Sequence, residues 1–124
     1  MSEIPEQLAY TSEHEWIAQA DTATVGITAF AVEELGEIVF VELPSVGDTV
    51  VAGTPVGEIE STKAVSEIYA PMNGEVVEVN DVLEGAPETL GDDPYGDGWL
   101  FKLKTEDGEY ELLDAAGYRQ LIES

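Results

Sequence analysis

The sequence lacks cysteine and has a single histidine, His14. Without cysteine, disulfide frameworks, thiolate zinc sites and iron–sulfur clusters are excluded, so any redox chemistry must come from a bound group. His14 has no second histidine four positions further on, and the chain contains no Gly-x-Ser-x-Gly elbow, so zinc-protease and serine-hydrolase sites are not expected. We interpret His14 as a half-exposed strand residue rather than a catalytic base. The sequence predicts no catalytic residue.

Basic residues are also scarce. The 124 residues include 27 Asp and Glu against 4 Lys and Arg, which gives a formal net charge of −23. Nucleic acid and anionic membranes are excluded as expected partners, because both require phosphate neutralisation by Lys and Arg. Mutual repulsion of so many carboxylates is relieved when salt shortens the screening length to about 3 Å at about 1 M. The composition therefore suggests adaptation to a salty cell interior.

Long apolar runs and targeting signals are missing as well. No stretch is long enough to span a bilayer, and residues 1–6 are acidic, without the basic start and apolar core of a signal peptide. A cytoplasmic location is predicted. The loop at residues 93–98 faintly resembles the start of a calcium site, yet Tyr95 and Lys104 occupy its third and twelfth positions, where ligands are required. No metal site is expected.

The residues that are present predict a mainly β fold with a few short helices. Alternating and β-branched segments predict strands at residues 15–19, 22–27, 37–43 and 99–104, with short β-segments between residues 47 and 80. The first two strands form a hairpin through Ala20 and Asp21. Frequent Gly and Pro between residues 47 and 74 favour a small sandwich or barrel. Residues 81–97 are interpreted as loop.

Two helices are predicted from their end signals. Thr28 is placed to cap a helix at residues 29–35, and Gly36 provides its left-handed end. The tail at residues 114–124 forms a second helix, with Asp114 as its cap and an apolar stripe of Ala115, Tyr118, Leu121 and Ile122. No linker divides the chain, so we expect one domain over residues 1–124, with a core at about 22–104 and the terminal helix at about 114–123.

Lys63 is the most informative position. It lies between two β-prone segments among the small residues Ser61, Thr62 and Ala64, which places it at a hairpin tip open to a modifying enzyme. On spacing alone, such a lysine is usually a solubility residue. Two stretches with the same order of turn, glycine, acid and apolar residues, at 46–51 and 73–78, flank this hairpin. That arrangement is expected if two related half-motifs meet there, although short β-motifs also resemble one another by coincidence.

The sequence resembles the H protein of the glycine cleavage system over nearly its whole length. The matching stretches are residues 10–17, with His14-Glu15-Trp16, and residues 25–28, 35–44, 60–64, 70–76 and 94–99. This family has the biotinyl/lipoyl barrel-sandwich hybrid fold, with two short sheets and a modified lysine on a hairpin. The resemblance therefore implies that fold, with short helices including the C-terminal one.

The resemblance also implies a non-catalytic shuttle with lipoate in amide linkage to Lys63. Glycine decarboxylase (P protein) would load an aminomethyl group, aminomethyltransferase (T protein) would pass the one-carbon unit to tetrahydrofolate, and dihydrolipoamide dehydrogenase (L protein) would reoxidise the arm. A lipoate-attaching enzyme is a further implied partner, and the protein is expected to be a monomer. In the family, carboxylates near a surface cleft are thought to contact the loaded amine. The matching positions here are Glu15 and Glu67, where an aspartate is common.

Other roles remain open at this point. Biotinyl carriers place methionine on both sides of the lysine, and lipoyl domains of 2-oxo-acid dehydrogenases usually have aspartate before it, whereas this chain has Thr62 and Ala64. A lipoyl relay or storage protein that supplies lipoate to other enzymes is compatible with the same residues. A purely structural acidic domain is the third class, and an unmodified Lys63 would support it. Glu15 and Glu67 are equally compatible with ordinary solvated acids.

Overall fold

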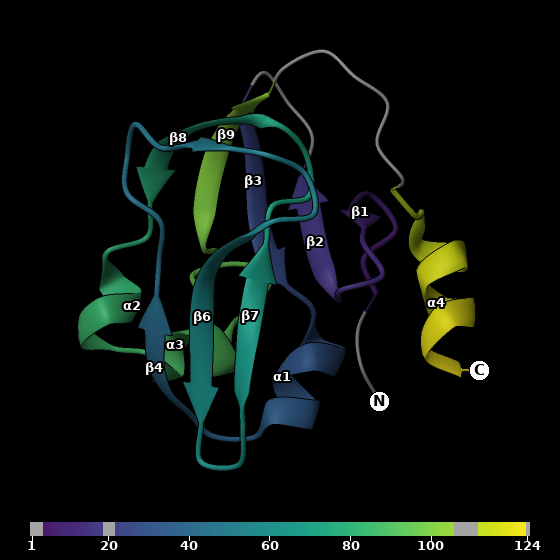
Figure 1. Ribbon diagram of the computed structural model, residues 1–124. Helices are drawn as coiled ribbons and strands as arrows, with labels where there is room; N and C mark the ends of the chain where they lie inside the picture. The colour runs from purple at the N-terminus through teal and green to yellow at the C-terminus, as the bar shows by residue number, and fades with distance from the viewer. Residues whose placement is uncertain (1–3, 19–21, 106–111, 124) are drawn as a thin grey trace.

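The computed structural model describes residues 4–18, 22–105 and 112–123, and these form two antiparallel sheets with four short helices (Figure 1). The elements are β1 Ala9–Tyr10, β2 Glu15–Ala18, β3 Thr22–Ile27, α1 Ala29–Leu35, β4 Ile38–Glu42, β5 Thr49–Val50, β6 Pro55–Ser61, β7 Val65–Tyr69, β8 Gly74–Val79, α2 Val82–Gly85, α3 Glu88–Asp92, β9 Phe101–Thr105 and α4 Ala115–Glu123. The larger sheet has the order β1-β2-β3-β9-β8-β5 and the smaller one β4-β6-β7.

The core lies between the two sheets. Buried side chains from both sheets belong to one cluster, to which Ile17 and Phe101 contribute from the larger sheet and Val41, Ile59 and Ile68 from the smaller one. Strand alternation explains this, because in β6 and β4 the residues that pair with one another, Ile59 and Val41, point inward together. The predicted mainly β barrel-sandwich architecture is therefore confirmed.

The two similar stretches around the lysine hairpin pair with one another. In the register of β5 and β8, Thr49 lies opposite Glu75 and Val50 opposite Gly74, and the Gly47 amide donates to the Val76 carbonyl at 2.7 Å. The two stretches thus lie side by side on one sheet.

The capped helix follows the prediction closely. The Thr28 hydroxyl accepts the Ala31 amide at 3.2 Å, α1 runs from Ala29 to Leu35, and Gly36 ends it with a φ of 83°. The hairpin of β2 and β3 also forms, although its predicted turn at Ala20 and Asp21 lies outside the described residues.

The terminal helix α4 begins after Asp114, whose side chain accepts the Gly117 amide at 2.7 Å. Ala115 and Tyr118 are buried against Tyr10 and Trp16 in a second apolar cluster, and Ile122 packs against it. The predicted stripe is wrong at Leu121, which is 40% exposed because it lies toward the solvent side of this short helix. None of the helices in the described ranges is long and apolar enough to cross a membrane.

Three further expectations are corrected. Residues 81–97 are not simply loop, because α2 and α3 form there and bury Leu83 and Leu90 in the main core. Helices of four or five residues are too short for their periodicity to be read from sequence. His14 lies in the turn before β2 with a φ of 67° and is not a strand residue. The last long strand begins at Phe101, two residues later than expected.

Candidate functional site

Lys63 lies at the exposed tip of the hairpin formed by β6 and β7, as predicted (Figure 1). Ser61 fixes the tip: its hydroxyl oxygen accepts the amides of Lys63 at 3.1 Å and Ala64 at 3.0 Å, and its own amide donates to the Ala64 carbonyl at 2.8 Å. The Thr62 amide donates to the Glu37 carbonyl at 3.0 Å, which ties the tip to the start of β4. The backbone is therefore held while the lysine side chain stays accessible.

The side chain of Lys63 lies against Gly36, at the end of α1. A Cβ atom placed on Gly36 would be 3.3 Å from Lys63 Cε and 3.9 Å from Nζ. Glycine is favoured here because a φ of 83° disfavours other residues, and a larger side chain would also displace the end of the lysine. The free carbonyl end of a helix also favours a cation nearby. The lysine is thereby directed toward α1.

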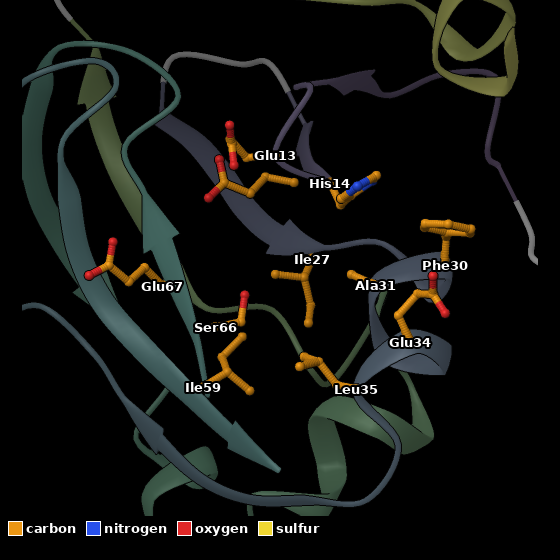
Figure 2. A pocket seen from close by; sticks show the side chains of 11 residues that line it. Glu13, His14, Ile27, Phe30, Ala31, Glu34, Leu35, Ile59, Ser66 and Glu67 are labelled. Carbon is orange, nitrogen blue, oxygen red and sulfur yellow. The ribbon is translucent and has the colours of Figure 1, made fainter. Parts of the chain in front are cut away.

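A pocket of about 260 Å³ opens beside α1, close to the lower end of the roughly 300–1,000 Å³ usual for small-molecule sites. Figure 2 shows its lining, with Glu67 on the side of the smaller sheet and Phe30 and Glu34 on the side of α1. The lining residues are Glu13, His14, Glu15, Ile27, Phe30, Ala31, Glu34, Leu35, Ile59, Ser66 and Glu67. Leu35 directly precedes Gly36, the residue against which the lysine side chain lies.

Glu15 is the buried carboxyl group of this pocket, with only 2% of its surface exposed. Its Oε2 accepts the Tyr69 amide at 2.7 Å, which joins β2 of the larger sheet to β7 of the smaller one, and its Oε1 accepts the Thr11 hydroxyl at 3.4 Å. Burial raises the pKa of Glu15 to about 8, although both hydrogen bonds act to lower it and nearby Glu13 adds to the rise. Glu15 is therefore largely protonated at neutral pH unless a cation approaches.

Glu67 reaches the same pocket from β7 but is exposed to solvent. Its Oε2 accepts the hydroxyl of Tyr69 at 3.0 Å, so the residue whose amide binds Glu15 also orients Glu67. The structure thus brings the two predicted acids to one pocket through Tyr69. They differ in environment, because Glu15 is desolvated whereas Glu67 is hydrated.

Sequence comparisons identify the family of the chain. The family model described as Glycine cleavage H-protein matches residues 8–124. The chain belongs to this family. It is 53% identical to the glycine cleavage system H protein of Mycolicibacterium smegmatis, with 98% of each chain covered, and 54% identical to that of Kocuria rhizophila, with 99% of this chain and 100% of the relative covered.

A solved structure gives the same result. The chain superimposes on the crystal structure of a glycine cleavage system H protein from Mycobacterium marinum with a TM-score of 0.92 and 46% identity, covering 98% of this chain and 100% of the other. Membership in the H-protein family confirms the prediction of a lipoyl-carrier component of glycine cleavage that is not itself a catalyst.

Several residues that line the pocket of this H-protein family member were not predicted from the sequence. Phe30, Ala31, Glu34 and Leu35 line the pocket from one side of α1, and their spacing of one, three and four residues was available as a signal. Nothing in the sequence indicates that Tyr118 of α4 lies beside His14, 104 residues away, where its hydroxyl is 2.9 Å from Nδ1. Among the described residues, no group of three His, Asp or Glu side chains is arranged to hold a metal ion.

Proposed function

We propose that Lys63 carries lipoate in amide linkage and that the pocket beside α1 shelters the group loaded onto it. One observation carries this proposal: the Lys63 side chain leaves an exposed hairpin tip and lies on Gly36, next to the pocket residue Leu35. An arm attached there has a short path into the pocket. Acylation also removes the lysine charge, so the modified tip loses its favourable contact with the end of α1 and gains freedom to move.

The residues present fit such a group. Ile27, Leu35 and Ile59 provide an apolar wall for a hydrocarbon chain and ring, and the carboxyl groups of Glu15 and Glu67 lie at the same pocket. Lipoate bound to Lys63 would supply a dithiolane that accepts a one-carbon unit and a pair of electrons. The chain itself then has only to hold, shield and present that group.

Glu15 and Glu67 are proposed to contact the cationic amine of the loaded group. A cation beside Glu15 favours its charged form and compensates the burial that keeps it protonated otherwise. Glu67 adds a hydrated carboxylate whose position is set by Tyr69. Apolar walls combined with acidic residues, Glu13 and Glu34 in addition to these two, match a short aminoalkyl group better than an anionic one.

The enzymatic steps around the carrier follow from this assignment. Glycine decarboxylase would load the aminomethyl group, aminomethyltransferase would remove the one-carbon unit, and dihydrolipoamide dehydrogenase would receive the electrons, after a lipoate-attaching enzyme has modified Lys63. A tether raises the effective concentration of the arm at each docked enzyme to about millimolar. A monomeric domain over residues 1–124 working in the cytoplasm suits such successive docking.

Mass spectrometry tests the attachment site. Intact-mass and peptide analysis of protein purified from its own organism is expected to find lipoate on Lys63, and an unmodified Lys63 would contradict the proposal. Lys63→Arg keeps the charge but removes the acylatable amine, so glycine–bicarbonate exchange should be lost with the fold intact. Lys104→Arg, at an exposed position of β9, is the matched control and should exchange normally.

The same experiment separates glycine cleavage from the relay role. A protein that only passes lipoate to other enzymes would be modified at Lys63 yet would not support exchange with the decarboxylase. The acids are tested separately: Glu15→Gln and Glu67→Gln should each shorten the lifetime of the loaded form when aminomethyltransferase is omitted. Unchanged lifetimes would remove both residues from the proposed contact.

A further inference from the structure

The C-terminal helix contacts two segments that border the pocket through Tyr118, whose ring packs edge-on against His14 with centroids 5.7 Å apart. Tyr118 of α4 is fully buried, and its hydroxyl oxygen lies 2.9 Å from His14 Nδ1 and 2.7 Å from Thr28 Oγ1. His14 lines the pocket from the turn before β2, and Thr28 caps α1, whose residue Phe30 lines the pocket next to His14. Tyr118, near the end of the chain, thus contacts both of these neighbouring segments.

Either hydroxyl is able to donate in the bond between Thr28 and Tyr118, and the role of His14 Nδ1 depends on its tautomer. We infer the direction that gives the buried Thr28 proton an acceptor. Thr28 Oγ1 accepts the Ala31 amide at 3.2 Å, so the buried Thr28 hydroxyl proton is satisfied by donation to the Tyr118 oxygen. The Tyr118 proton is then free to donate to His14 Nδ1, which requires a neutral ring with its proton on Nε2. Burial lowers the pKa of His14, whereas Glu13 and Glu34 act to raise it, and the ring of Phe30 packs against it.

Both ends of the network control backbone at the pocket. His14 has a φ of 67°, a conformation that residues with side chains rarely adopt, and its carbonyl accepts the Thr28 amide at 3.0 Å. The neighbours of His14 on either side, Glu13 and Glu15, are pocket acids. Thr28 fixes the first turn of α1, on which Phe30 and the rest of that wall depend.

We propose that Tyr118 is a positioning residue for this pocket. Through its bonds to His14 and Thr28, Tyr118 fixes α1 relative to the turn that contains Glu13 and His14, and this arrangement shelters the loaded group. The proposal rests on the proposed function of the pocket. In this proposal α4 does more than cover the second apolar cluster. That cluster requires only the ring of Tyr118, whereas the pocket requires the Tyr118 hydroxyl.

The chain offers a matched control. Tyr10 is also fully buried and stacks on Tyr118 with ring centroids 4.8 Å apart, but its hydroxyl donates to the Pro5 carbonyl at 2.7 Å, away from the pocket. Tyr118→Phe and Tyr10→Phe therefore remove the same atom from two stacked rings. Only the first variant breaks the contacts with His14 and Thr28.

Two measurements on these variants test the proposal. In the lipoylated protein loaded by glycine decarboxylase, with aminomethyltransferase omitted, Tyr118→Phe should release ammonia about two- to tenfold faster than wild type, the range expected from one neutral hydrogen bond. In the unmodified protein, the only histidine gives one titrating NMR signal, and its pKa should rise because the neutral ring loses its donor. Tyr10→Phe should leave both values at wild type.

The outcomes distinguish the positioning role of Tyr118 from the sheltering function of the pocket. A Tyr118→Phe protein that matches Tyr10→Phe in either measurement overturns the positioning role. If wild type itself fails to protect its cargo, the sheltering function is wrong. Amide exchange of Ala31, whose amide donates to Thr28 Oγ1, then tests the link to α1. Faster exchange only in Tyr118→Phe, together with the shifted histidine pKa, upholds that link. If Tyr118→Phe does not fold, Thr28→Val tests the other end, with Thr28→Ser, which keeps the hydroxyl, as its control.

Discussion

Replacing Glu15 by Gln should change how the stability of the protein depends on pH. Gln has nearly the same shape, and its carbonyl oxygen is able to accept the Tyr69 amide that Glu15 now accepts at 2.7 Å. The variant therefore keeps the connection between β2 and β7 while removing a buried ionisable group. The variant loses only the ionisable carboxyl group, whose pKa is raised by burial.

The size and sign of the effect follow from the raised pKa. Glu15 has a pKa of about 8 when folded, against a reference value of 4.5, so between these values the folded state holds a proton that the unfolded state has released. The resulting stability is fully present below about pH 4.5 and is lost as the pH rises through about 8. Between pH 7 and 9 the occupancy falls from about nine tenths to about one tenth, which costs about 1.4 kcal/mol.

Thermal unfolding at several pH values measures this loss. For 124 residues, about 1.4 kcal/mol corresponds to a fall of about 5 °C in the melting temperature from pH 7 to 9. Burial lowers the pKa of His14, so its titration acts in the opposite direction and cannot cause a fall in stability as the pH rises. Glu15→Gln should abolish the fall, and Glu67→Gln, which changes an exposed acid of the same pocket, should retain it. A wild-type melting temperature that is constant over this range would refute the assignment of a protonated Glu15.

Three other outcomes are expected. Gly36→Ala should lower the free energy of unfolding by about 1 kcal/mol in a denaturant titration, because the φ of this residue is 83°. The variant should also slow lipoate attachment in a lipoylation time course, because the new methyl group lies 3.3 Å from Lys63 Cε. Gly26→Ala places a methyl group 2.5 Å from the buried ring of Trp16, so we expect a loss of about 1–3 kcal/mol by denaturant titration. Raising NaCl from about 0.1 to about 1 M shortens the screening length from about 10 to about 3 Å and should raise the melting temperature; equal stability at both concentrations would contradict a halophilic origin of the charge of −23.

Features encoded in consecutive residues were predictable from the sequence. The α1 helix follows from Thr28 and Gly36, which act within one turn of its ends. The tip position of Lys63 follows from two β-prone segments separated by small residues. In both cases the deciding interactions are local, so periodicity and end signals contain the necessary information. Residues 81–97 show the limit of this reasoning, since their short helices form because Leu83 and Leu90 enter the core.

The pocket could be predicted only in part. The family resemblance named Glu15 and Glu67, but an acid in an acidic chain gives no sign of being buried. The burial of Glu15 depends on the Tyr69 amide, which arrives from the other sheet. Tyr118 is a comparable case: its ring was expected in the apolar stripe of α4, whereas its hydroxyl bonds depend on how that helix docks beside His14. Such contacts are set by packing between distant segments.

A buried, protonated Glu15 has a consequence for a carrier of a cationic group. Entry of an amine favours the carboxylate, so binding of the cation must be accompanied by release of the Glu15 proton, and cation binding should strengthen as the pH rises toward about 8. The free protein loses stability over the same range. Glu15 thus gives cation binding and protein stability opposite dependences on pH. Ionised Glu15 lowers the stability of the free protein, whereas an amine in the pocket binds best to ionised Glu15. Exposed Glu67 carries no comparable burial cost. The dependence of cargo protection on pH is therefore expected to follow Glu15.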